Sequence, residues 1–202
     1  MIRIAVILGS TRPGRLGKPV ADWVLARASE RGDAVFTLLD VADFELPLLD
    51  EPVPPSLGRY GHEHTKAWSA AVDAFDGYIF VTGEYNHSIP AALKNALDYL
   101  YREWNNKAAG FVSYGSSGGT RAVEHLRCVA GELQLADVRA QVALPLATEF
   151  EHYRRFIPSE AAETNLQALL DQLIAWAGAL KVLRPNAAPH KTVPRKEGGL
   201  AA

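Results

Sequence analysis

The chain has little cysteine and little net charge, and each shortage excludes some classes of protein. One cysteine in 202 residues, Cys128, excludes an intrachain disulfide and a zinc site built on several cysteines, and it fits a reducing compartment such as the cytoplasm. Its apolar neighbours predict a buried, inert thiol. The 21 basic residues nearly balance the 23 acidic ones, so the charge predicts binding to neither nucleic acid nor an anionic membrane.

Long apolar runs and metal-ligand patterns are also lacking. We find no run long enough to predict a membrane span. The short apolar start of the chain runs into Arg12, Arg15 and Lys18 without a small-residue cleavage site, which is typical of a buried strand and not of a signal peptide. The histidines have no spacing that resembles a metal site, so we expect no bound metal.

The chain is rich in apolar segments of two alternating kinds. Continuous β-branched runs predict strands that are buried on both faces, and apolar residues three or four positions apart predict helices. Strands are expected at 2–8, 34–39, 77–82, 107–114 and 138–144, and helices at 19–31, 65–75, 88–104, 118–133 and 159–183.

This alternation predicts one α/β domain over residues 1–183. We expect a flavodoxin-like three-layer sandwich, a five-stranded parallel sheet of order 2-1-3-4-5 with helices on both faces. Ligands bind such a sheet beyond the carboxyl ends of its strands, so the loops after the first, third and fourth strands should carry the chemistry. Residues 184–202, rich in Pro, Ala and Lys, are expected to form a disordered tail.

The loop from Gly9 to Lys18 leads directly into a helix and predicts an anion site. Backbone N–H groups at a helix N-terminus are unpaired, and the helix dipole favours negative charge. Ser10 and Thr11 add hydroxyl donors, and Arg12 suits a phosphate. The loop fits neither a Walker A motif nor a dinucleotide fingerprint, because Arg12 and Thr11 stand where those motifs need glycine. A single phosphate, as on FMN, fits what remains, and a solvated basic loop is the alternative.

The loop from Thr82 to Pro90 is short and dense in hydrogen-bonding groups. Its backbone amides and Asn86 can bind the edge of a heteroaromatic ring, with Tyr85 and His87 against or beside that ring. Capping of the next helix by Asn86 or Ser88 is the alternative, and it is compatible with ligand binding.

With these loops, the chain resembles the NADPH-dependent FMN reductase family, which includes quinone, azo and chromate reductases. Three motifs in family order and spacing carry the resemblance: GSTRPGR at 9–15, EYNHSIPAALKNALD at 84–98 and YGSSGGTRA at 114–122. The likeness covers residues 1–180 or so. It implies non-covalently bound FMN, hydride transfer from NADPH or NADH, and a cytoplasmic homodimer or homotetramer.

The resemblance also suggests a reaction. We expect a ping-pong cycle in which the oxidised nucleotide leaves before a small acceptor enters the same cleft, the acceptor being a quinone, free flavin, azo compound or metal oxyanion. The cofactor carries the redox chemistry, so no catalytic side chain is assigned.

The family motifs imply FMN contacts residue by residue. The first motif holds the phosphate, the second contacts the isoalloxazine, and the third lies near its pyrimidine side. Arg15 and Gly17 stand where many members have Ser and Asn. Gly83 replaces the usual Pro, which we expect to alter flavin affinity or loop mobility. The implied FMN-binding residues are Ser10, Arg12, Arg15, Leu16, Gly17, Gly83, Glu84, Tyr85, Asn86, His87, Ser113, Tyr114, Ser116, Ser117, Gly118 and Gly119.

Two other functions fit parts of the chain. Residues 115–119 match G-x-S-x-G, and Asp137 and His152 follow in order, so a hydrolase with Ser117 as nucleophile is one alternative. That reading leaves the other two loops without a role. The second alternative is a flavodoxin-type electron carrier without NAD(P)H activity, which strong acidity would favour and the near-neutral charge does not.

Aromatic residues close the helix expected at 88–104. Tyr99, Tyr101 and Trp104 can belong to the core or to an oligomer interface that places aromatic surface over the partner's flavin. We expect at least part of this aromatic group to lie in an interface.

Overall fold

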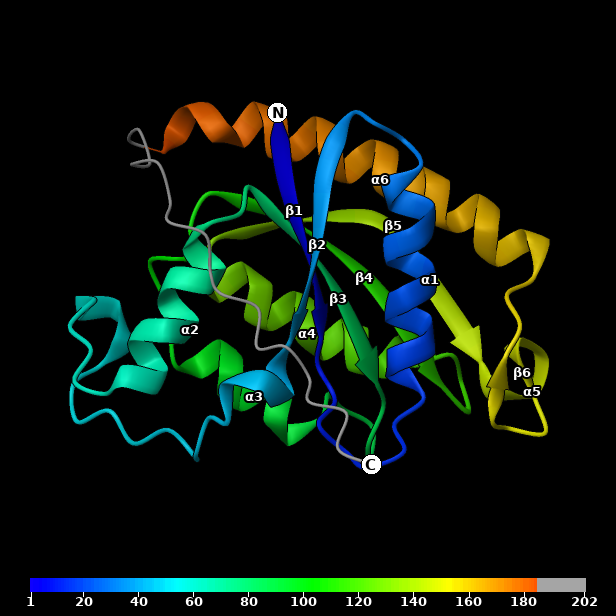
Figure 1. The fold of residues 1–202 in the computed structure, drawn as a ribbon, viewed down its shortest axis with the longest axis horizontal. Coiled ribbons are helices and arrows are strands. Elements are labelled where there is room, and N and C mark those ends of the chain that lie inside the picture. Colours follow the sequence, from blue (N-terminus) through cyan, green and yellow to red (C-terminus); the bar gives the residue numbers. More distant parts are fainter. Residues whose placement is uncertain (185–202) are drawn as a thin grey trace, which may run out of the picture.

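The apolar runs of the chain form one central sheet in the computed structural model, which describes residues 1–184 (Figure 1). The sheet strands are β1 (Ile2–Leu8), β2 (Ala34–Asp40), β3 (Gly77–Gly83), β4 (Lys107–Gly115) and β5 (Leu135–Pro145). The helices are α1 (Gly17–Ser29), α2 (Glu63–Asp73), α3 (Ala91–Asp98), α4 (Thr120–Glu132), α5 (Leu146–Glu149) and α6 (Glu160–Leu180). A small hairpin of β6 (Phe150–Glu151) and β7 (Arg155–Phe156), which the sequence did not predict, precedes α6.

The strands lie in the order β2-β1-β3-β4-β5 and every pairing is parallel, which confirms the predicted topology. At the end of β1, Leu8 is in register with Asp40 of β2 and with Val81 of β3. Because the strands are parallel, their carboxyl ends share one edge of the sheet, the lower edge in Figure 1.

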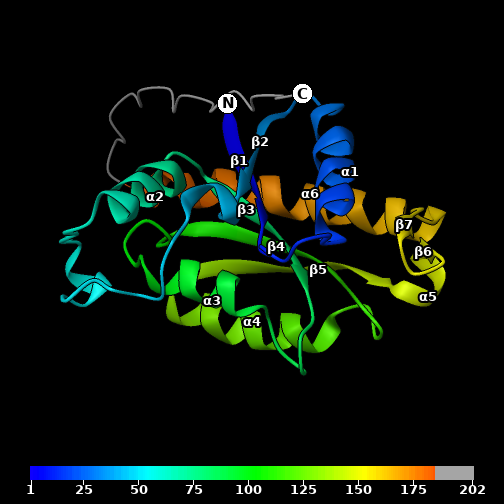
Figure 2. The same cartoon turned by 60° about the horizontal axis from the view of Figure 1, so that its bottom comes forward.

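Two apolar layers hold the sandwich together. Ile4, Val6 and Leu8 of β1 pack toward α1 and α6, and Ala5 and Ile7 pack toward the layer of α2, α3 and α4. All five side chains are fully buried, as expected for a central parallel strand with both faces covered. Figure 2 shows α3 and α4 on one side of the sheet and α1 on the other.

The helix predicted over 88–104 is shorter in the structure, because α3 ends at Asp98 and turns follow it. These turns fold Tyr99 and Trp104 back into the layer of α2 and α3, where both are fully buried. The expected interface role is therefore wrong for these two residues, and Tyr101 is half-buried against the same cluster.

Cys128 is exposed, so the prediction of a buried thiol is wrong. The buried stripe of α4 contains Val123, Leu126 and Ala130. Cys128 lies two positions from both Leu126 and Ala130, and residues two apart on a helix point to opposite sides. Apolar neighbours in the sequence therefore do not place this residue in the core.

One helical segment of 24 residues, Glu160–Leu183, is long and apolar enough to cross a membrane by length and composition alone, with a mean hydropathy of 1.3 in its most apolar 18-residue window. The core helices of globular proteins meet the same criterion, so the segment is weak evidence for a membrane span. Its apolar stripe packs on the sheet. The buried residues of α6 are Ala162, Leu166, Leu169, Leu170, Leu173 and Ala177.

Most of the predicted tail, residues 185–202, lies outside the described residues. Its first residue, Arg184, is described and belongs to the fold. The Arg184 guanidinium donates to the carbonyl of Phe75 at 3.2 Å and forms an ion pair with Asp76.

Candidate functional site

The loops after β1 (residues 9–16, loop one), β3 (84–90, loop three) and β4 (116–119, loop four) meet at the carboxyl edge of the sheet (Figure 2). The N–H of Gly9 donates to the carbonyl of Val81 at 3.0 Å, which ties loop one to β3. The hydroxyls of Ser10 and Tyr85 lie 3.3 Å apart, which links loop one to loop three. Burial raises the pKa of Tyr114, at the end of β4, from 10.0 to about 12, so this hydroxyl remains protonated even in alkaline solution.

Loop one ends in a helix N-terminus that is open to an anion. The N-cap of α1, Leu16, offers no side-chain hydrogen bond, and the first turn holds no acidic residue. Ser10 is buried, and its Oγ accepts from the N–H of Arg12 at 3.4 Å. The Arg12 side chain is exposed and has no ion pair among residues 1–184. Unpaired N–H groups, a helix dipole and a free guanidinium together fit a phosphate group.

Arg15, which was expected to contact the phosphate, has its guanidinium engaged by protein groups. It forms a two-bond ion pair with Asp40 at the end of β2 and donates to the carbonyl of Ser10. The Arg15 and Asp40 side chains are only 18% and 10% exposed. The positive charge of Arg15 is therefore compensated inside the protein.

The second helix N-terminus at this edge, that of α4, is occupied by a carboxylate. Glu84 forms an ion pair with Arg121 in the first turn of α4, and its side chain is 5% exposed. Burial alone would raise the pKa of Glu84, but the Arg121 guanidinium and the nearby N–H groups of Ala122 and Arg121 outweigh burial and hold that pKa below its usual value. The Oε2 atom of Glu84 has no hydrogen-bond partner among residues 1–184. Because a negative charge already faces α4, the N-terminus of α1 is the better anion site.

Loop three forms a two-residue hairpin whose tip points to solvent. Tyr85 and Ser88 exchange backbone hydrogen bonds of 2.9 and 3.1 Å. Between them, Asn86 and His87 both have positive φ values of 48° and 76°. Tyr85, Asn86 and His87 are exposed, so their side chains and the peptide groups between them are available to a flat ligand.

Loop four is buried where it joins β4 and α4, and it is exposed at its tip. The Ser113 hydroxyl donates to the carbonyl of Gly118 at 2.7 Å, which closes the loop on β4. Gly118 and Gly119 both have positive φ, and a Cβ on Gly119 would lie 2.8 Å from the Cβ of Ser113. Ser116 and Ser117 are exposed above this turn. Of these two glycines, only Gly119 belongs to the G-x-S-x-G match, and its positive φ and close packing against Ser113 give that glycine a structural cause.

The hydrolase alternative fails on geometry. Asp137 pairs in register with Ala109, six residues before Gly115 ends β4, which places its backbone roughly 20 Å along the strand from loop four. The Asp137 carboxylate is paired with Arg127. Asp137 therefore cannot support Ser117 in a catalytic triad.

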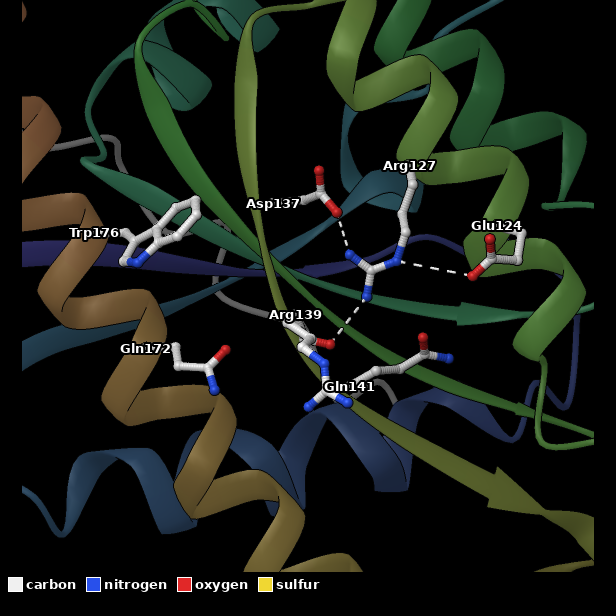
Figure 3. A pocket seen from close by; sticks show the side chains of 7 residues that line it. All are labelled: Glu124, Arg127, Asp137, Arg139, Gln141, Gln172 and Trp176. Atoms are coloured by element: carbon white, nitrogen blue, oxygen red, sulfur yellow. Dashed lines mark hydrogen bonds and ion pairs between the residues drawn. The ribbon is translucent and has the colours of Figure 1, made fainter.

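A groove away from these loops runs along the edge strand β5 between α4 and α6 (Figure 3). Its side chains pair with the free backbone groups of the edge. Arg127 donates to the carbonyl of Val138 at 3.0 Å, and Gln172 accepts from the N–H of Ala140 at 3.0 Å. Such pairing protects an edge strand against association with other strands. The groove is lined by Glu124, Arg127, Asp137, Arg139, Gln141, Gln172 and Trp176.

The structure adds residues at the site edge that sequence reasoning missed. Asp40 contacts loop one through Arg15, and Arg121 contacts loop three through Glu84. His125 of α4 shares a 2.9 Å hydrogen bond with the Ser88 hydroxyl. Only the position of Asp40, a carboxylate that ends a strand beside loop one in the predicted order, offered a signal in the sequence. Within residues 1–184, no group of three or more His, Cys, Asp or Glu side chains could hold a metal ion.

Comparison with known proteins agrees with this geometry. A family model described as NADPH-dependent FMN reductase matches residues 2–149. The NAD(P)H-dependent FMN reductase ntnL of Nectria sp is 45% identical over 128 residues, which cover 60% of this chain and 64% of that protein, just under two thirds of its length. An NAD(P)H-dependent FMN reductase of Schizosaccharomyces pombe is 42% identical over 146 residues, which cover 71% of this chain and 73% of that protein.

A solved structure shares the fold. The flavoenzyme FerB, an NAD(P)H:(acceptor) oxidoreductase from Paracoccus denitrificans, aligns with a TM-score of 0.69 at 22% identity, over 89% of this chain and 98% of FerB. The predicted resemblance is thus confirmed. Because the family model spans far more than half of the chain and contains all three loops, this protein belongs to the NADPH-dependent FMN reductase family.

Proposed function

We propose that this protein is an NAD(P)H-dependent FMN reductase of the quinone reductase type, a soluble oxidoreductase that passes electrons from a nicotinamide nucleotide to a small acceptor. The observation that carries the proposal is the open N-terminus of α1 beside the free Arg12, at the edge where all three family motifs meet. When bound there, FMN supplies the hydride chemistry.

The chain's own residues bind and orient the cofactor. The N–H groups of loop one and the start of α1, with Ser10 and Arg12, hold the phosphate. When FMN is bound, the exposed tip of loop three would contact the ring and loop four would contact its pyrimidine side. Arg15, whose guanidinium is engaged by Asp40 and the Ser10 carbonyl, acts in this proposal through the loop backbone and not by direct contact. The residues proposed to form the FMN site are Ser10, Arg12, Arg15, Leu16, Gly17, Gly83, Glu84, Tyr85, Asn86, His87, Ser113, Tyr114, Ser116, Ser117, Gly118 and Gly119.

The protein contributes position and electrostatics, and no side chain acts as an obligatory acid or base. The residues at the tips of loops three and four are exposed, and their backbone N–H groups would favour the negative charge that develops during reduction. The nucleotide and the acceptor use the same opening in turn, which gives ping-pong kinetics. Quinones are the proposed acceptors because a relative from Escherichia coli, 33% identical over 134 residues, is named a quinone reductase.

We further infer a cytoplasmic homodimer or homotetramer. The single cysteine suits a reducing compartment. Leu48, Leu49 and Leu57, on the segment between β2 and α2, are 82%, 43% and 45% exposed, and apolar surface of this kind is typical of subunit contacts. Light scattering after size-exclusion chromatography measures the mass, and a monomer at micromolar concentration would contradict the inference.

The proposal is tested by the absorption spectrum of the purified protein before and after anaerobic NADPH, followed by NADPH and NADH oxidation with a quinone. We expect flavin bands that NADPH bleaches and a quinone restores. Flavin bands that NADPH leaves unchanged would identify an electron carrier instead. A colourless protein that takes up no added FMN would contradict the proposed function altogether.

A further inference from the structure

An ion pair joins loop one to the strand beside it. Asp40 is the last residue of β2, and its register partner Leu8 is the last residue of β1. From loop one, the Arg15 guanidinium reaches across to Asp40, with Nη1 to Oδ1 at 2.9 Å and a second bond from Nη2 to Oδ2. We call the Arg15–Asp40 pair the loop-one clamp.

The clamp is held at both ends by the backbone. Oδ1 of Asp40 also accepts from the N–H of Ala42 at 3.0 Å, which fixes the carboxylate. Nη1 of Arg15 also donates to the carbonyl of Ser10, inside loop one. One guanidinium therefore bridges a fixed carboxylate and the backbone of the proposed phosphate loop.

Holding the Ser10 carbonyl has a consequence for the next N–H group. In a planar trans peptide, the C=O and the following N–H point in opposite directions. Because Arg15 holds the Ser10 carbonyl toward β2, the N–H of Thr11 is directed away from β2. The clamp thus sets the direction of one loop-one donor before any ligand arrives, which lowers the ordering cost of binding.

The two arginines of loop one differ in whether an acidic residue balances their charge. Asp40 balances the charge of Arg15, and both side chains are largely buried. Arg12 is exposed and has no ion pair among residues 1–184. The phosphate therefore meets Arg12 as its counter-ion, and Arg15 acts on it through the shape of the loop.

We propose that Asp40 is a positioning residue for phosphate binding, acting through Arg15 on the backbone of loop one. This inference rests on the proposed function for the identity of the ligand. It changes the expected role of Arg15 from a direct phosphate contact to a part of the clamp.

The test is a double-mutant cycle of Asp40→Asn and Arg15→Ala, read as the dissociation constants of FMN and of riboflavin, which lacks the phosphate. We expect each single variant to weaken FMN binding about tenfold, the usual scale for losing one charged hydrogen-bonding partner. Riboflavin binding should change little. The double variant should bind FMN no more weakly than Arg15→Ala alone, because both changes break the same clamp.

Two control variants sharpen the cycle. Asp137→Asn breaks another Arg–Asp ion pair, with Arg127 at the far end of the sheet, and should leave FMN affinity unchanged. Arg15→Lys keeps the charge but cannot form two parallel bonds, so it should weaken FMN binding nearly as much as Arg15→Ala. Wild-type affinity in Arg15→Lys would mean that charge, not the clamp, matters.

Two results would contradict the proposed role of Asp40. If Arg15→Ala weakens FMN by the same factor with Asp40 or Asn at position 40, Arg15 contacts the phosphate directly and the inference fails. Unchanged FMN affinity in Asp40→Asn would also overturn it. If the wild-type protein binds neither FMN nor riboflavin, the proposed function fails, and hydrogen exchange of residues 9–17 in the FMN-free protein still tests the clamp. Faster exchange in both single variants supports it, and unchanged exchange overturns it.

Discussion

The ring of Tyr114 occupies the space that a side chain at position 17 would need, since a Cβ on Gly17 would lie 2.8 Å from the Tyr114 hydroxyl oxygen. The same Cβ would lie 2.9 Å from Leu8. A Cβ on Gly83 would also lie 3.1 Å from the Tyr114 ring. Gly17 and Gly83, two positions expected from the sequence to depart from the family motifs, thus border one buried tyrosine that joins β4 to loop one.

Gly17→Ala should therefore destabilise the protein and weaken FMN binding. Inserting a methyl group against a packed ring costs about 1–3 kcal/mol, and the resulting shift moves the first residue of α1. Chemical denaturation and FMN titration measure both effects. Adding Tyr114→Phe, which removes the clashing hydroxyl, should restore part of the stability.

Gly131→Ala is the matched control, because a Cβ there meets nothing within 4 Å near the end of α4. It should stabilise the protein by up to about 1 kcal/mol through helix propensity. A Gly17→Ala variant as stable as the wild type would contradict the packing argument.

Arg12→Ala should weaken FMN binding by about 1.5–3 kcal/mol, the usual range for a hydrogen bond to a charged group. The reason is that Arg12 is exposed, free of ion pairs among residues 1–184, and next to the open N-terminus of α1. Fluorescence titration with FMN and riboflavin measures the effect. Riboflavin affinity should not change, and Arg12→Lys should keep part of the FMN affinity. An equal loss for both ligands would show that Arg12 does not act on the phosphate.

Most of the fold followed from the sequence because its main signals are local. Continuous apolar runs such as 2–8 and 77–82 identify buried strands on their own, and their alternation with helices restricts the topology. The errors came from residues whose place depends on tertiary contacts. Tyr99 and Trp104 are buried because the chain turns after α3, which no helical pattern shows.

The site was predictable at the level of loops and less so at the level of contacts. Motif spacing identified loops one, three and four, and the sheet order explains why they meet. The partner of Glu84 was not predictable, because Arg121 lies 37 positions away in the sequence. The position of Asp40 at the end of the neighbouring strand placed it near loop one, but not in contact with Arg15, 25 positions away. Which of several charged residues pairs with a loop depends on the register of neighbouring strands and on where a helix begins.

His87→Gly should stabilise the protein, because His87 has a φ of 76°, a left-handed conformation that favours glycine. The expected gain in the free energy of unfolding is about 1 kcal/mol, measured by chemical denaturation. Asn86→Gly is the comparison. Its gain should be smaller, since asparagine tolerates positive φ better than histidine.

If His87 is kept because it lies beside the ring, His87→Gly should also lower FMN affinity or quinone turnover while the fold becomes more stable. A strained residue at a functional site is expected to show this opposition. A destabilised His87→Gly variant would contradict the strain argument, and a stabilised variant with unchanged flavin binding and turnover would remove His87 from the site.

The buried Lys107 should make the protein more stable as pH rises above 8. Burial lowers the pKa of Lys107 from its ordinary value of 10.5 to about 8, and its side chain is only 2% exposed. Between these two values the unfolded chain binds a proton that the folded protein does not, so the free energy of unfolding increases with pH. The expected slope grows from about 0.7 kcal/mol per pH unit at pH 8, where half of the folded molecules still carry the proton, to about 1.2 kcal/mol per pH unit near pH 9. Above pH 10 the buried Tyr78, whose pKa is raised by burial, opposes this gain.

Lys107→Met should abolish that slope, because methionine keeps the length of the side chain and removes the titrating amine. Urea denaturation at several pH values between 7 and 9.5 measures it. Lys66→Met, at an exposed lysine paired with Glu63, should keep the slope of the wild type. If Lys107→Met gains stability with pH as steeply as the wild type does, another group is responsible and Lys107 remains charged inside the fold. A flat wild-type profile over this range would also mean that Lys107 stays charged in the folded protein, because a lysine that keeps its ordinary pKa gives no slope.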